Sequence, residues 1–203
     1  GNVYSGFYKE GTHVIVPVPK CYIEDERATK ILAVVRELMK SFRLPPYFED
    51  DGYGVMRHIL IKTSYYYKQI MVVLVTAVDS FPSRNNFVHA LLERCPEITT
   101  VVQNINSRHT SVVLGDHTRV LYGKGFIRDT LCGVNFRISA KSFYQTNPIM
   151  TEILYKTAMD FAELTPNDVV FDAYSGIGTI GLIAAKSVKR VISVEIVPEA
   201  VSD

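Results

Sequence analysis

The residues best suited to chemistry lie close together in the last quarter of the chain. An apolar run ends in Asp172, a turn with Gly176 and Gly178 follows, and a second apolar run ends in Glu195. Glycines leave bare backbone against which a ligand can lie, and a carboxylate at a strand tip can accept hydrogen bonds from both hydroxyls of a ribose. This order predicts a site for a nucleotide-type cofactor in a doubly wound α/β fold.

Three interpretations of this turn stay open. Gly176, Gly178 and Gly181 satisfy the G-x-G-x-x-G pattern of dinucleotide sites, a weak signal on its own, and the turn could also hold no ligand. Two details favour S-adenosylmethionine: Asp172 ends the first strand, and residues 173–175 make a longer turn than a dinucleotide fold normally has before its first glycine. The cofactor contacts predicted here are Asp172, Tyr174, Gly176, Gly178, Thr179 and Glu195.

Length and composition limit the function only loosely. The 203 residues are 47% hydrophobic and 21% charged, as in ordinary globular proteins, and allow one large domain or two small ones. The net charge of +1 argues neither for nor against nucleic acid, because a local basic patch can lie on a near-neutral chain. No apolar run is long enough to span a membrane, so we expect no membrane association.

Three cysteines, Cys21, Cys95 and Cys132, are widely spaced and form no C-x-x-C pair. Such cysteines are typical of a reducing compartment, so we expect a cytoplasmic protein without a self-contained zinc site.

The elements before the glycine turn indicate an α+β domain with an antiparallel sheet. Apolar residues between Ile31 and Phe42 have helical spacing, and residues 86–93 suit a short helix. Residues 55–63 and 69–78 read as a hairpin joined by Tyr65, Tyr66 and Tyr67. Further short strands are expected at residues 13–18, 99–105, 119–122 and 132–139.

The character of the chain changes at Pro148. Residues 150–164 predict an amphipathic helix, after which the strand, turn, helix and strand of the cofactor motif follow. We therefore predict an α+β central domain over residues 1–145 and the first part of a Rossmann-like α/β domain, truncated, over residues 146–203. An open sheet edge is a liability, so we expect a second copy or another partner to cover the final strand, or the C-terminal segment to be poorly ordered.

Residues 136–148, F-R-I-S-A-K-S-F-Y-Q-T-N-P, carry a family resemblance. They resemble the segment that leads into the methyltransferase domain of the RNA (uracil-5-)-methyltransferases. The following helix and the unit from Asp172 to Glu195 continue the match in order, and residues 55–62 resemble the family's central-domain strand. The resemblance covers most of the chain, from about Gly6 to the end.

The resemblance implies transfer of a methyl group from S-adenosylmethionine to C5 of a uridine in rRNA or tRNA, with rRNA favoured. It implies that Gln145 contacts the cofactor and that Phe143 lies near the target base. Base methylation requires the base to leave the RNA stack. Among the basic side chains that could position RNA phosphates we select Arg57, and Tyr65 to Tyr67 could stack on unpaired bases.

In the resembled family a cysteine thiolate adds to C6 of uracil and C5 then takes the methyl group. A general base removes the C5 proton, and the C6–sulfur bond breaks to release the cysteine. Both groups lie downstream of the ribose-binding acid, so we expect them after Asp203 and predict that this chain contains no catalytic residue and is inactive. Cys21 resembles the last of four iron–sulfur ligands, so we expect an orphan ligand or a buried thiol, with any cluster confined to the full-length parent. An NAD(P)-dependent oxidoreductase fragment and a non-catalytic RNA-binding module remain alternatives.

Overall fold

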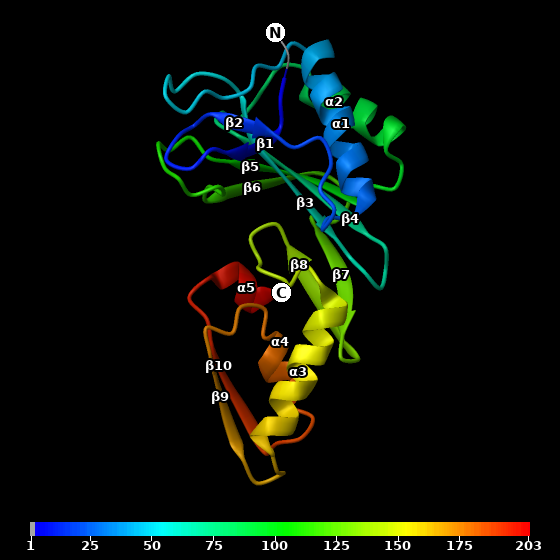
Figure 1. Ribbon diagram of the computed structural model, residues 1–203, viewed down its shortest axis with the longest axis vertical. Coiled ribbons are helices and arrows are strands. Elements are labelled where there is room, and N and C mark those ends of the chain that lie inside the picture. Colours follow the sequence, from blue (N-terminus) through cyan, green and yellow to red (C-terminus); the bar gives the residue numbers. More distant parts are fainter. Residues whose placement is uncertain (1–2) are drawn as a thin grey trace. The chain divides into compact units, whose positions relative to one another are not determined.

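The computed structural model describes residues 3–203, which divide into two compact units (Figure 1). The first unit contains residues 3–63 and 70–125, and the second contains residues 64–69 and 126–203. The second unit thus includes a short turn from the earlier part of the chain.

A four-stranded sheet forms the centre of the first unit. Its strands, in spatial order, are β3 (Met56–Thr63), β4 (Ile70–Thr76), β5 (Thr100–Ile105) and β6 (His117–Tyr122). The pairs β3–β4 and β5–β6 are antiparallel, whereas β4 and β5 are parallel. The prediction of an antiparallel sheet is therefore wrong for the central pair, because the helix α2 (Arg84–Arg94) lies in the connection between β4 and β5 and returns the chain to the starting end of the sheet.

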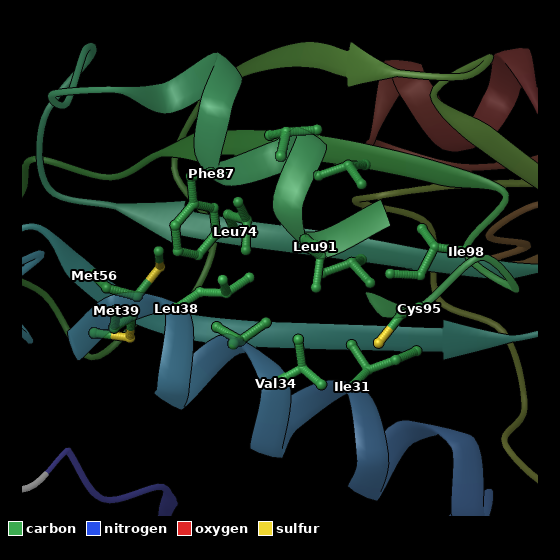
Figure 2. Close-up of a cluster of buried hydrophobic side chains, with 14 of the residues drawn as sticks. Ile31, Val34, Leu38, Met39, Met56, Leu74, Phe87, Leu91, Cys95 and Ile98 are labelled. Atoms are coloured by element: carbon green, nitrogen blue, oxygen red, sulfur yellow. The ribbon is translucent and has the colours of Figure 1, made fainter. Parts of the chain in front are cut away.

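The core of the first unit lies between this sheet and the two helices α1 (Glu26–Ser41) and α2. Ile31 and Leu38 of α1 and Phe87 and Leu91 of α2 pack with Leu74 of β4 in one cluster of buried side chains (Figure 2). Every residue of β4 is buried. The helical spacing that predicted α1 therefore reflects a face that the sheet covers. A separate two-stranded antiparallel ribbon, β1 (Gly6–Tyr8) and β2 (Ile15–Pro17), is exposed along its whole length.

The second unit contains an antiparallel hairpin followed by a strand–helix–strand motif. The hairpin strands are β7 (Phe126–Leu131) and β8 (Val134–Ser139), and β7 was not predicted from the sequence. The elements that follow are α3 (Pro148–Ala162), β9 (Val169–Ala173), α4 (Thr179–Ala184), β10 (Arg190–Val194) and α5 (Pro198–Ser202). Strands β9 and β10 are parallel neighbours, as the sequence predicted for the cofactor motif.

The compact units divide at Gly125, ahead of the predicted domain boundary at residue 145. The division falls there because the β7–β8 hairpin is hydrogen-bonded to later parts of the second unit. The Cys132 N–H donates to Glu152 of α3 at 2.7 Å, and the Ser139 N–H donates to Asp203 at 2.8 Å. The assignment of residues 1–145 and 146–203 as functional domains stays a prediction.

Much of the apolar surface of the second unit is exposed. The amphipathic helix predicted over residues 150–164 is present as α3, but only its Thr151 and Tyr155 are buried, and Ile153, Leu154 and Phe161 are exposed. Val169 and Phe171 of β9 are likewise exposed. Between residues 3 and 203, no helix is both long enough and apolar enough to cross a membrane.

Candidate functional site

The turn after β9 adopts a backbone conformation that explains its glycines. Gly176 and Gly178 have positive φ angles of 57° and 76°, which glycine adopts at little cost. Tyr174 also has a positive φ, of 60°, which is uncommon for a residue with a side chain, and its ring is almost fully exposed. The Ser175 N–H donates to the Val194 carbonyl at 3.0 Å, so the turn stays attached to β10.

The three glycines of the G-x-G-x-x-G pattern have different roles. A Cβ added at Gly176 would meet nothing within 4 Å, and one at Gly178 would meet only the Leu182 side chain, at 3.5 Å. At Gly181 a Cβ would lie 2.7 Å from Asp172 Oδ2 and 3.0 Å from Ser193 Oγ. Gly181 is therefore required for the packing of α4 on the strands, whereas Gly176 borders open space that a ligand could occupy.

Glu195 closes this turn with its carboxylate. Its Oε2 accepts from the Gly176 N–H at 2.7 Å, and its Oε1 accepts from the N–H groups of Ile196 and Val197, both at 2.8 Å. The N–H donors of Val197 and Gly176 lower the pKa of Glu195 below its ordinary value. A carboxylate has about four acceptor positions, so Glu195 is ionised, fixed in orientation and able to accept a further hydrogen bond.

Two more predicted residues have defined partners. Asp172 Oδ2 accepts from the Gly181 N–H at 2.9 Å, which ties the end of β9 to α4. The hydroxyl of Thr179, the first residue of α4, lies 3.0 Å from the hydroxyl of Tyr155 on α3. Both residues hold the glycine turn in place through side-chain contacts that the sequence did not reveal.

The segment that leads into α3 presents Phe143 and Gln145 to solvent. Phe143 is 73% exposed, and Gln145 is also exposed. Asn147 caps α3, since its side-chain oxygen accepts from the Met150 N–H at 3.1 Å. Phe143 is therefore not a core residue, and Asn147 rather than Gln145 caps the helix. Burial raises the pKa of the intervening Tyr144.

Asp203 anchors this segment to the helix that follows Glu195. Its carboxylate accepts from the Ser139 N–H at 2.8 Å and from the Ser142 hydroxyl, and it lies 3.3 Å from Arg137 Nε. Lys141 Nζ donates to Glu199 of α5 at 2.7 Å. In the part of the chain that the structure describes, no hydrogen bond joins Gln145 to the glycine turn, and these anchors link the segment before Phe143 to α5. The sequence held no signal for them.

Arg57, our candidate for an RNA contact, is an internal structural residue. Its side chain is 0% exposed and forms a bidentate pair with Glu49, with a closest approach of 2.6 Å. It also donates to the carbonyls of Asn106 and Arg108 at 2.8 and 2.7 Å, and its guanidinium lies 4.7 Å from the centre of the Tyr47 ring. Arg57 therefore holds two loops of the first unit together and has no face free for a phosphate.

In residues 3–203 no metal site is found, and neither Cys95 nor Cys132 is an activated nucleophile. No group of three or more His, Cys, Asp or Glu side chains there could hold a metal ion, and the role of Cys21 as an iron–sulfur ligand stays a prediction. Burial raises the pKa of Cys95 and of Cys132, which disfavours the thiolate.

No family model matches the chain. Over its full 203 residues it is 41% identical to a Streptococcus mutans protein named uncharacterized RNA methyltransferase and 43% identical to a Listeria monocytogenes protein of the same name. The chain spans 45% of each relative's length.

One solved structure shares the architecture described above. The crystal structure of Pyrococcus abyssi tRNA (uracil-54, C5)-methyltransferase in complex with S-adenosyl-L-homocysteine matches with a TM-score of 0.71 at 23% identity. The match covers 88% of this chain and 42% of that chain, so the fold is shared with just under half of that protein.

Proposed function

Because the chain belongs to the RNA methyltransferase family that its curated relatives represent, we propose that it is part of an enzyme that methylates C5 of a uridine in RNA. The observation that carries this proposal is the glycine turn closed by the ionised Glu195 carboxylate, with open space beside Gly176. The resemblance of residues 136–148 to the RNA (uracil-5-)-methyltransferases supports the choice of base and of carbon. The RNA is rRNA in preference to tRNA.

The site residues fit S-adenosylmethionine, which supplies the methyl group when bound. Glu195 would accept a hydrogen bond from a ribose hydroxyl, because its carboxylate is ionised, held at the tip of β10 and has an acceptor position left. Gly176 and Gly178 would leave the backbone open to the methionine part of the cofactor. The exposed Gln145 carboxamide and the exposed Tyr174 ring would complete the cofactor contacts.

Phe143 would contact the target base. Its ring is exposed on a segment that is anchored on both sides, by Asp203 before it and by the capped start of α3 after it. An exposed and positioned aromatic ring suits stacking on a base that has left the RNA helix.

The nucleophilic cysteine and the general base would lie beyond Asp203, so the 203-residue chain alone would bind cofactor without turnover. The relatives are longer than the match, and Val169 and Phe171 of β9 are exposed. We propose that further parts of the protein, or a partner chain, cover this surface.

Titration with S-adenosyl-L-homocysteine tests the cofactor assignment. Gly176→Ala would place a methyl group in the space proposed for the cofactor, and Gly11→Ala is its matched control. Gly11 also has a positive φ, of 67°, and its added Cβ also meets nothing within 4 Å, so both changes impose similar backbone strain. Calorimetry should show binding by the wild-type chain and by Gly11→Ala, and weaker binding by Gly176→Ala. Binding of NADH instead, or equal binding by both variants, would contradict the assignment.

RNA tritiated at C5 of uridine tests the reaction. The complete protein should release tritium on methylation, because the C5 proton leaves, whereas the 203-residue chain should release none. Methylation without tritium release would exclude C5, and turnover by the 203-residue chain would show that it contains its own catalytic groups.

A further inference from the structure

The second unit carries an aromatic and basic surface that the cofactor site does not use. Its first part is the turn formed by Tyr65, Tyr66, Tyr67 and Lys68, here called the tyrosine turn. All three rings are exposed, Tyr66 the most, at 65%. Its second part is the exposed side of the β7–β8 hairpin, here called the arginine face, and consists of Phe126, Arg128, Thr130, Asn135 and Arg137.

A buried carboxylate holds the backbone of the tyrosine turn. Asp129 is 0% exposed, and its two oxygens accept from the N–H groups of Tyr65 and Tyr66 at 2.9 and 2.8 Å. The Ser64 hydroxyl accepts from the Tyr67 N–H at 3.1 Å, and the Gln69 side chain accepts from the Arg128 N–H of β7 at 2.7 Å. The rings are therefore presented by a backbone that is already ordered, which lowers the entropic cost of binding a ligand.

The arginine face gathers two guanidinium groups over one ring. Arg128 and Arg137 are cross-strand partners, and their guanidinium carbons lie 5.9 and 4.3 Å from the centre of the Phe126 ring. Arg137 also approaches Asp203 at 3.3 Å. Asp203 offsets part of this charge, but like charges held side by side on a sheet repel each other, so this face still favours a partner that brings negative charge.

The tyrosine turn and the arginine face are continuous. The Tyr67 hydroxyl donates to Asn135 Oδ1 at 3.2 Å, and the Thr130 hydroxyl donates to the same oxygen at 2.7 Å. Lys68 adds a third positive charge, with its ammonium 4.4 Å from the centre of the Tyr65 ring. Exposed aromatic rings thus lie next to basic groups along one surface of one unit.

We propose that this surface binds a single-stranded segment of RNA, with bases stacked on Tyr65 and Tyr66 and phosphates paired with Arg128 and Arg137. The proposal rests on the proposed function and adds a second RNA contact to Phe143. Neighbouring rings and cations match a single strand, in which every base has a face for stacking and every linkage carries a negative charge. An acidic peptide would satisfy the arginines but would leave the exposed tyrosine rings without stacking partners.

Fluorescence anisotropy with labelled oligouridine tests this surface. Tyr66→Leu removes a stacking ring, and Tyr22→Leu, at a side chain 88% exposed in the first unit, is the matched control. Loss of one stacked base should weaken binding by about fivefold or more. Arg128→Gln should reduce the slope of log affinity against log salt by about 0.7, the value expected for one phosphate on a single strand. Lys9→Gln in the first unit is the charge control and should leave the slope unchanged.

The outcomes separate this proposal from the function on which it rests. Weaker RNA binding by both surface variants, with S-adenosyl-L-homocysteine binding and thermal unfolding unchanged, supports it. RNA binding unchanged in both variants overturns the surface and leaves the function intact. A wild-type chain that binds neither RNA nor S-adenosyl-L-homocysteine overturns both. Displacement of the RNA by polyglutamate at equal charge would identify the surface as one for acidic peptides and would overturn the RNA assignment. If Tyr66→Leu fails to fold, Arg128→Gln alone tests the proposal: a reduced slope of log affinity against log salt supports the surface, and an unchanged slope overturns it.

Discussion

The two compact units differ in how far the apolar residues of their strands are buried. In the first unit every residue of β4 is buried, and Ile70, Val72 and Leu74 pack in one cluster with α1 and α2. In the second, β9 alternates between exposed and half-buried residues, and Phe171 is 63% exposed. The first unit therefore has a closed core between its sheet and helices, whereas the second carries the proposed functional surfaces and leaves apolar residues of β9 exposed.

The units also differ in whether a key charged side chain is enclosed or accessible at the surface. Arg57 of the first unit is fully enclosed by Glu49, backbone carbonyls and Tyr47, and serves only to hold loops. Glu195 of the second unit also binds backbone N–H groups, but it remains at the surface of the glycine turn. A buried charge stabilises a fold only when it is fully paired, whereas a charge that binds a ligand must keep some of its capacity free.

The largest expected difference between the units is the cost of removing a phenylalanine side chain. Phe87→Ala in the core of the first unit should lower the free energy of unfolding by about 3–5 kcal/mol, because it leaves a cavity beneath β4. The matched change Phe171→Ala in the second unit should alter it by less than about 0.5 kcal/mol. Urea denaturation measures both. Equal losses would show that Phe171 is covered in solution.

The next effect concerns the glycine turn. Glu195→Gln removes the charge that accepts hydrogen bonds from Gly176, Ile196 and Val197, and should weaken S-adenosyl-L-homocysteine binding by about tenfold or more, since a hydrogen bond to a charged group contributes about 1.5–3 kcal/mol. Glu163→Gln, at an exposed carboxylate just after α3, is the control.

The pKa of Glu195 is lowered from its ordinary value of 4.5, so in the folded chain the carboxylate is still ionised at a pH at which a free glutamate is half protonated. Cofactor affinity should therefore not change through Glu195 as the pH falls from about 8 to about 5. A decline centred within that window would assign the ribose contact to another group.

A smaller effect is expected at the tyrosine turn. Asp129→Asn keeps the side-chain shape but replaces one acceptor by a donor, leaving an N–H of Tyr65 or Tyr66 without its partner at a cost of about 1–3 kcal/mol. Hydrogen exchange of these two amides should accelerate, and oligouridine should bind more weakly. Asp168→Asn, at an exposed carboxylate that accepts from Thr165, should do neither.

The smallest effect is a pH dependence of the first unit. Burial, with a further contribution from Arg57, lowers the pKa of His58 from its ordinary value of 6.5, so the folded state disfavours the proton that the unfolded state takes up. Stability from this source is present above pH 6.5 and falls as the pH decreases towards the lowered pKa. Thermal unfolding at a series of pH values should show a smaller decline for His58→Gln than for the wild type, whereas His89→Gln, at an exposed histidine, should follow the wild type.

Part of this structure could be predicted from local patterns. The spacing between Ile31 and Phe42 predicted α1, and the apolar runs that end in Asp172 and Glu195 predicted the parallel strands β9 and β10. Strand β7 was missed because Asp129 interrupts its apolar residues. That carboxylate is buried only because the turn of Tyr65 and Tyr66, distant in sequence, supplies its N–H donors.

By itself, the sequence determined the periodic elements and the glycine turn, since backbone preference and side-chain alternation act over a few residues. Only the tertiary structure decided that Arg57 is enclosed, that Asp203 anchors the segment before Phe143, and that the first unit is closed while the second is open. Whether a charged or apolar side chain is buried depends on segments that are far away along the chain, and local composition does not record which of them will pack against it.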